Sequence, residues 1–224
     1  MLNCLVENNL NEGIKGDKFH VDNCTIRGNG GVGISGDSYG FHIRNCEVKN
    51  NNGGIRGSVG KFVLINCLIT NNALFGVYSM SCGFDIYNCT VINNEDGGIT
   101  GYEDVQQMPT EPYVFNTIIW GNSGIQVKYF YTGGTNLYHC FIQNGWTFSG
   151  SNNSDNYPEF SDTVNADWSL KNYSPCINEE QMTLALLSWK LTLQVIPEFM
   201  MEYMTLLILG PMNFRVIIHA QYYT

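Results

Sequence analysis

The sequence has little charge and few basic residues. Only 14% of its 224 residues are charged, and 20 acidic residues against 11 Lys and Arg leave a formal net charge of −9. A surface that binds nucleic acid needs a stripe of basic residues to neutralise phosphates, and no such stripe is present. The composition argues against a nucleic-acid partner and suits contact with neutral or cationic ligands.

The sequence also lacks a CxxC pair and a cluster of histidines, so its cysteines do not resemble a metal centre. Eight cysteines in a short chain can indicate a disulfide framework. Five of them, however, recur at one position of a repeat, which indicates buried free thiols that pack as small apolar residues. These are Cys4, Cys24, Cys46, Cys67 and Cys89.

No export signal precedes the first repeat, which begins at Asn3 directly after Met1 and Leu2. A secreted protein needs such a signal, and a solenoid needs a cap over its first coil. We therefore expect the natural N-terminus to lie upstream, so that this sequence is a fragment.

Six repeat units begin at Asn3, Asn23, Asn45, Asn66, Asn88 and Asn116, at intervals of 20, 22, 21, 22 and 28 residues. Each unit has an aliphatic residue three positions later and an asparagine six positions later. The second asparagines are Asn9, Asn29, Asn51, Asn72, Asn94 and Asn122. A Gly-aliphatic pair follows: Gly13-Ile14, Gly33-Ile34, Gly54-Ile55, Gly76-Val77, Gly98-Ile99 and Gly124-Ile125. Four units end with Phe19, Phe41, Phe62 and Phe84.

Short runs of alternating apolar residues predict strands, and the Asn and Gly residues between them tolerate the positive φ of sharp turns. The repeat predicts an all-β, single-stranded, right-handed parallel β-helix of about six to seven coils, followed by an irregular C-terminal tail. In this fold like side chains stack at about 4.8 Å, and stacked Asn amides can bond to one another. A β-sandwich with coincidental spacing is the alternative.

The pattern N-C-x-[IV]-x-x-N followed by G-[IV] resembles the repeats of the pectate-lyase-like superfamily. The closer resemblance is to secreted and surface β-helix proteins of Bacteroidetes. Asn116 to Asn122 resembles their last regular coils, and Tyr157 to Asp162, Asp167 to Leu170 and Ser174 to Asn178 resemble the segment that closes them. The resemblance covers about residues 3 to 178. It implies the fold but not an activity, since this architecture carries many functions.

The composition changes after Asn178: glycine and asparagine nearly vanish and methionines become frequent. If the reading frame is moved back by one nucleotide, Gln194 to Phe214 can be read as A-G-N-P-R-I-Y-D-G-x-Y-D-x-V-D-I-G-x-Y-E-F, which resembles the terminal module of those proteins. We therefore divide the chain into coils (1–148), a closing segment (149–178) and a frameshifted, non-native tail (179–224). A membrane-attached tail is the alternative, but Pro197 and the charged residues fit a membrane span poorly.

Outward-facing residues form rows along a β-helix, and functional side chains are expected among them. The predicted rows include Arg44, Lys49 and Arg56, but no cluster of carboxylates beside them. Asp17 and Asp37 share a phase and could hold a Ca²⁺ ion, although turn capping is the simpler interpretation. His20 and His42 also share a phase, but two imidazoles make a weak metal site. We therefore predict no metal site and no cofactor. The predicted rows are Lys15, Ser35, Arg56, Tyr78, Thr100 and Gln126; Asp22, Arg44, Ile65, Tyr87, Phe115 and Tyr138; and Arg27, Lys49, Thr70, Ile92 and Trp120.

Aromatic residues gather toward the C-terminal coils, where flat exposed rings suit the apolar faces of sugars. The predicted binding residues are Tyr78, Tyr87, Tyr102, Trp120, Tyr129 and Tyr131. The alternative is that several of these rings, and Trp146, cover the ends of the coils.

These features predict a non-catalytic module, extracellular or on the cell surface, that engages polysaccharide or surface glycans. A polysaccharide lyase whose site lies partly in missing N-terminal coils is the second hypothesis, and it is weaker because the sequence offers no acid–base constellation. A fragment without independent function, whose exposed strand edge pairs with other chains, is the third.

Overall fold

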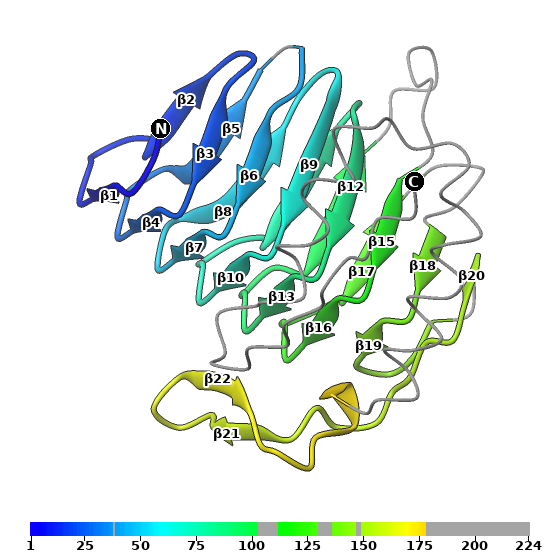
Figure 1. Cartoon of the computed structure of the whole chain (residues 1–224). Coiled ribbons are helices and arrows are strands. Elements are labelled where there is room, and N and C mark those ends of the chain that lie inside the picture. The colour runs from blue at the N-terminus through cyan, green and yellow to red at the C-terminus, as the bar shows by residue number, and fades with distance from the viewer. Residues whose placement is uncertain (38, 103–111, 130–135, 147–148, 178–224) are drawn as a thin grey trace, which may run out of the picture. The chain divides into compact units, whose positions relative to one another are not determined.

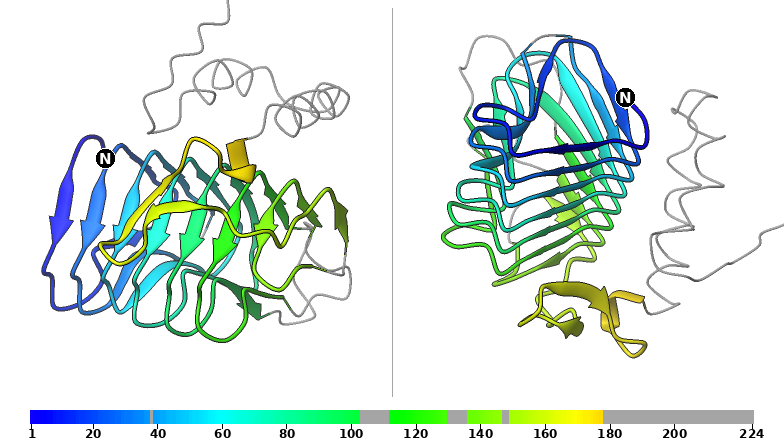
Figure 2. Two further views of the ribbon diagram at one scale, coloured as in Figure 1. Left: turned by 90° about the horizontal axis from the view of Figure 1, so that it is seen from below. Right: turned by 90° about the vertical axis from the view of Figure 1, so that its left-hand side faces the viewer.

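The computed structural model describes residues 1–37, 39–102, 112–129, 136–146 and 149–177. Up to Pro158 the chain forms a parallel β-helix in which three sheets run along one axis (Figures 1 and 2). We name each sheet by its first strand. The β1 sheet contains β1 (Leu5–Glu7), β4 (Thr25–Arg27), β7 (Glu47–Lys49), β10 (Leu68–Thr70), β13 (Thr90–Ile92), β16 (Ile118–Trp120) and β19 (Phe141–Ile142).

The other two sheets are built in the same way from the remaining strands of each coil. The β2 sheet contains β2 (Ile14–Gly16), β5 (Val32–Gly36), β8 (Gly53–Gly57), β11 (Val77–Met80), β14 (Ile99–Tyr102) and β17 (Val127–Tyr129). The β3 sheet contains β3 (His20–Asp22), β6 (His42–Arg44), β9 (Lys61–Ile65), β12 (Gly83–Tyr87), β15 (Tyr113–Phe115), β18 (Asn136–Tyr138) and β20 (Gly150–Ser151).

The predicted phase of the repeat is the observed register of the β1 sheet. Ile26 pairs with Val48, Val48 with Ile69, and Ile69 with Val91. All four side chains are fully buried, because alternate residues of each strand face the interior of the coil. The all-β, parallel, coiled architecture predicted from the sequence is confirmed.

Cysteine and phenylalanine form two further stacks inside the coils. Cys24, Cys46, Cys67 and Cys89 are buried, and none of the described cysteines forms a disulfide. Burial raises the pKa of the Cys67 thiol well above its usual value, so the thiols are unreactive packing groups. The rings of Phe19, Phe41, Phe62 and Phe84 stack in sequence with centroids 5.1, 5.0 and 5.5 Å apart.

The predicted asparagine ladder is present and is buried from Asn29 onward. The side-chain amide of each rung donates to the Oδ1 atom of the next, for example from Asn51 to Asn72 at 3.2 Å and from Asn72 to Asn94 at 2.9 Å. Each Oδ1 also accepts the backbone N–H of the preceding rung. The ladder thus satisfies backbone groups that the turn would leave without partners.

Other asparagines form the sharp corners between strands. Asn45, Asn66 and Asn88, the first residues of their units, have φ between 51° and 58°. A second corner uses Asn50, Asn71 and Asn93, with φ between 54° and 55°. Asparagine tolerates this left-handed conformation better than most residues, which explains its abundance here.

The last predicted Gly-aliphatic pair, Gly124-Ile125, lies two residues before the positions that continue the β2 sheet. Ile99 pairs with Val127, not with Ile125, and Gln126 faces the ladder instead of solvent. Its Oε1 atom accepts the side-chain amide of Asn122 at 2.8 Å, and its Nε2 atom donates to the Asn122 carbonyl oxygen at 2.8 Å. Val127 follows Asn122 by five residues, as Ile99 follows Asn94, so Lys128 and not Gln126 continues the outward row that contains Tyr78 and Thr100.

Residues from Glu159 onward belong to a second unit. Its described part contains an antiparallel pair, β21 (Phe160–Asp162) and β22 (Asp167–Leu170), and a 3₁₀ turn, η1 (Pro175–Ile177). Phe160 packs edge-on against Trp168. The predicted frameshifted tail, 179–224, lies outside the described residues. Within the described part, no helix has the length and apolar character to cross a membrane.

Candidate functional site

The outer face of the β3 sheet carries the most promising group of functional side chains. In β9 and β12, Phe62 and Phe84 point inward, so the alternation of a strand turns their neighbours outward. Lys61 of β9 and both Asp85 and Tyr87 of β12 therefore lie on the outside. Figure 1 shows these strands side by side with β15 and β18.

Three aromatic residues follow one another across this face. Tyr87 of β12 pairs with Phe115 of β15, and Phe115 pairs with Tyr138 of β18. All three side chains are half-buried, so part of each ring reaches the surface. Tyr113, in register with Asp85, is 40% exposed. The arrangement is a strip of partly exposed aromatic side chains on neighbouring strands, which lie about 4.8 Å apart.

A carboxylate and an ammonium group lie beside these rings. The Nζ atom of Lys61 is 2.8 Å from Oδ2 of Asp85, with 37% and 15% of the two side chains exposed. Burial raises the pKa of Asp85, although Lys61 and a hydrogen bond with Tyr87 act in the opposite direction. Burial and the nearby carboxylate also raise the pKa of Tyr87, so its hydroxyl stays protonated.

The N-terminal end of the same face is polar. The rings of His20 and His42 are in register, with centroids 4.8 Å apart. Burial, with repulsion from His20, lowers the pKa of His42. Asp22 forms an ion pair with Arg44, which holds the pKa of the carboxyl below its usual value.

The basic residues that a lyase would need as a base are held by carboxylates. Arg44 pairs with Asp22 on the β3 sheet. On the other two sheets, Lys49 lies 2.7 Å from Glu47, and Arg56 lies 3.7 Å from Glu12 and bonds to Ser35. Each of these side chains is therefore already engaged by an acidic partner instead of being aimed at an open site.

The predicted binding residues lie on three different sheets. Tyr87 is on the β3 sheet. Trp120, on the β1 sheet, packs edge-on against Tyr157, with centroids 5.8 Å apart. Tyr78, on the β2 sheet, packs against Phe75. Tyr102 and Tyr129 end β14 and β17 of that sheet, but their side chains, and all of Tyr131, lie outside what the structure describes.

The residues considered for metal binding do not form a cluster in the described part of the chain, which holds no group of three His, Cys, Asp or Glu side chains suited to a metal ion. Asp37 lies 3.5 Å from Lys15, so its charge is already partly neutralised. The insertion that contains Glu103 and Asp104 is outside the described residues.

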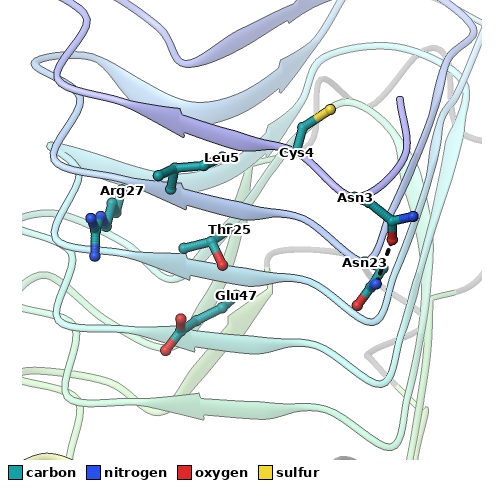
Figure 3. A pocket seen from close by; sticks show the side chains of 7 residues that line it. All are labelled: Asn3, Cys4, Leu5, Asn23, Thr25, Arg27 and Glu47. Atoms are coloured by element: carbon teal, nitrogen blue, oxygen red, sulfur yellow. Dashed lines mark hydrogen bonds between the residues drawn. The ribbon is translucent and has the colours of Figure 1, made fainter.

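An open depression of about 570 Å³ lies over the first coils of the β1 sheet (Figure 3). Leu5, Thr25 and Glu47 form one row across it, in register. Its charged side chains already form ion pairs: Arg27 pairs with Glu7, and Glu47 pairs with Lys49. It has no aromatic lining, which distinguishes it from the β3 sheet. The lining residues are Asn3, Cys4, Leu5, Asn23, Thr25, Arg27 and Glu47.

Sequence reasoning did not single out Lys61, Asp85 or Tyr113 as functional residues. A signal was present, because Asp85 and Tyr87 alternate with the inward Phe84 and Ile86. Recognising the cluster also requires the neighbouring coils in register, since Lys61 reaches Asp85 diagonally from the adjacent strand.

The sequence was compared with known protein families. Residues 1–157 match the family described as the right-handed beta helix region. No curated protein and no solved structure matches the chain.

Proposed function

This chain belongs to the right-handed β-helix family, and from that premise we propose that it is a non-catalytic module, extracellular or at the cell surface, that binds polysaccharide. The proposed binding surface is the outer face of the β3 sheet. The observation that carries the proposal is the strip of half-buried rings formed by Tyr87, Phe115 and Tyr138.

A parallel β-helix suits this role because its strands hold the rings in fixed positions. Binding then orders few protein groups, which lowers the entropic cost of association. Partly exposed aromatic side chains offer apolar faces to sugar rings, and tyrosine also offers a hydroxyl group. The net charge of −9 does not oppose a neutral polymer.

The lyase hypothesis has less support. Its candidate bases Arg44, Lys49 and Arg56 are each engaged with carboxylates. The described residues also lack a cluster of acidic groups that would hold a catalytic cation. A binding module requires neither feature.

Affinity electrophoresis of the full chain through gels containing soluble polysaccharides tests the proposal. We expect at least one polymer to retard the protein, and Tyr138→Ala to weaken that binding about 2- to 13-fold, the worth of one aromatic contact. Tyr173→Ala is the matched control, because this tyrosine is 65% exposed and lies outside the β-helix. Absence of retardation by any polymer, or equal binding by Tyr138→Ala, would overturn the proposal.

The same polymers distinguish the enzyme hypothesis. A lyase creates an unsaturated product that absorbs ultraviolet light, so incubation with uronate polymers, with and without Ca²⁺, should leave the absorbance unchanged. A rise that Arg44→Ala or Arg56→Ala abolishes would establish catalysis instead.

A further inference from the structure

We propose that Lys61, Asp85, Tyr87 and Tyr113 form a subsite that binds one uncharged sugar ring, so that the module prefers neutral polysaccharides to polyuronates. The inference rests on the proposed function and specifies the ligand class for the same face.

The four residues come from three adjacent strands of one sheet. Asp85 lies opposite Tyr113 of β15, in register, and two residues before Tyr87 in β12. The carboxylate therefore has one aromatic ring beside it on the neighbouring strand and another on its own strand. Lys61 reaches it from β9 on the other side. The group combines ring faces for the apolar side of a sugar with a donor and an acceptor for its hydroxyls.

Asp85 has unused hydrogen-bonding capacity. Its Oδ2 atom accepts from Lys61, whereas its buried Oδ1 atom has no hydrogen-bond partner in the described part of the chain. A buried acceptor without a partner is unfavourable, and more so when it is charged. The Asp85 side chain remains 15% exposed, so a ligand hydroxyl can reach this carboxylate. A sugar that donates one hydroxyl there removes the penalty.

Charge sets the preference for a neutral ring. The ammonium group of Lys61 is 2.8 Å from Asp85 and is therefore already neutralised. A uronate carboxylate at this position would face Asp85 while Lys61 is already paired, in the field of a chain whose net charge is −9. An uncharged hexose or pentose meets no such repulsion.

The test measures dissociation constants of the full chain for a neutral glucan or mannan and for polygalacturonate, by affinity electrophoresis at fixed ionic strength. We expect tighter binding to the neutral polymer. Asp85→Asn should weaken that binding about 5- to 15-fold, because a hydrogen bond to a charged acceptor becomes one to a neutral acceptor. Asp96→Asn, at an exposed turn of the same β-helix, should leave it unchanged.

A second variant guards against misfolding of the first. Tyr87→Phe keeps the ring but removes a hydroxyl of the proposed subsite that could bond to the sugar, and we expect a 2- to 5-fold loss with an unchanged circular dichroism spectrum. Tighter binding to polygalacturonate than to the neutral polymers would overturn the inference, as would full affinity in both Asp85→Asn and Tyr87→Phe. If Tyr138→Ala alone weakened binding, the subsite would fail while the proposed function stood. No binding to any polymer would refute both.

Discussion

Replacing Asn72 with alanine should destabilise the β-helix strongly, because this side chain is fully buried in the middle of the ladder. Its Nδ2 atom donates to the Val48 carbonyl oxygen at 3.2 Å and to Asn94 Oδ1 at 2.9 Å. Its Oδ1 atom accepts the backbone N–H of Asn51 at 3.0 Å and the side-chain amide of Asn51 at 3.2 Å. Alanine removes all four bonds and leaves buried backbone groups without partners.

The expected loss follows from these four bonds. A typical intramolecular hydrogen bond contributes about 0.5–1.5 kcal/mol, so the variant should lose about 2–6 kcal/mol of unfolding free energy. Domains are stable by only about 5–15 kcal/mol, so this loss is a large fraction of the total. Because a solenoid is held together by contacts between neighbouring coils, the defect should also weaken the coupling of the two halves.

Urea denaturation followed by circular dichroism measures the loss of unfolding free energy. Faster hydrogen exchange at the backbone N–H of Asn51 would show that the defect lies at this rung of the ladder. The matched control is Asn66→Gly, at the corner that begins the same repeat unit. Asn66 has φ of 58° and donates one exposed bond to Asn45, and glycine keeps the backbone conformation, so this change should cost about 1 kcal/mol or less. A cost for Asn72→Ala no larger than that of the control would refute the reasoning.

Three further predictions test the packing and the titratable groups. Gly54→Ala should unfold the central coils in thermal melts, because its Cβ atom would overlap a carbonyl oxygen of the next coil, whereas Gly124→Ala has open space and should cost about 1–2 kcal/mol for its φ of 76°. Unfolding free energy should fall as the pH is lowered from 6.5 toward the depressed pKa of His42, since the folded state binds fewer protons there; His42→Val should flatten this dependence in urea titrations. In the native protein a thiol reagent should modify the exposed Cys4 and spare Cys67, and mass spectrometry of labelled peptides distinguishes them.

The interior of the β-helix could be predicted from the sequence because the same environment recurs in every coil. Cys46, Phe62 and Asn72 each have counterparts in the coils above and below, so one reading of the repeat located all of them. Each of these residues packs against its counterparts one coil away, and the regular interval between counterparts is visible in the sequence. The confirmed ladders are therefore the part of the fold with the strongest sequence signal.

The role of the paired glycines was predicted less well. Gly54 and Gly76 do not have positive φ, so turn conformation does not explain them. A Cβ atom on Gly76 would lie 2.7 Å from the Asn94 amide nitrogen, which shows that the ladder leaves no room for a side chain. Glycine is required here by close packing between coils, a relation that spans about one repeat and is invisible in local sequence.

The outer surface was harder to predict because its side chains differ from coil to coil. The row containing Tyr87, Phe115 and Tyr138 was correctly placed, yet the predicted aromatic set spread over three sheets. Lys61 and Asp85 meet diagonally, and that contact depends on side-chain length as well as register. Contacts of this kind cannot be predicted from the spacing of the repeat alone.

Departures from the repeat are therefore the better guide to function in this protein. The unit between Asn88 and Asn116 is 28 residues long, against 20 to 22 in the others, and its last strand, β15, supplies Tyr113 and Phe115 to the proposed site. Where a coil follows the repeat, packing accounts for its residues. Where a partly buried ion pair such as Lys61–Asp85 occupies an outward row, packing does not account for it, since the paired groups lose hydration that an apolar pair would not need. This cost, together with the adjacent rings, is the physical reason for placing the binding surface on the outer face of the β3 sheet.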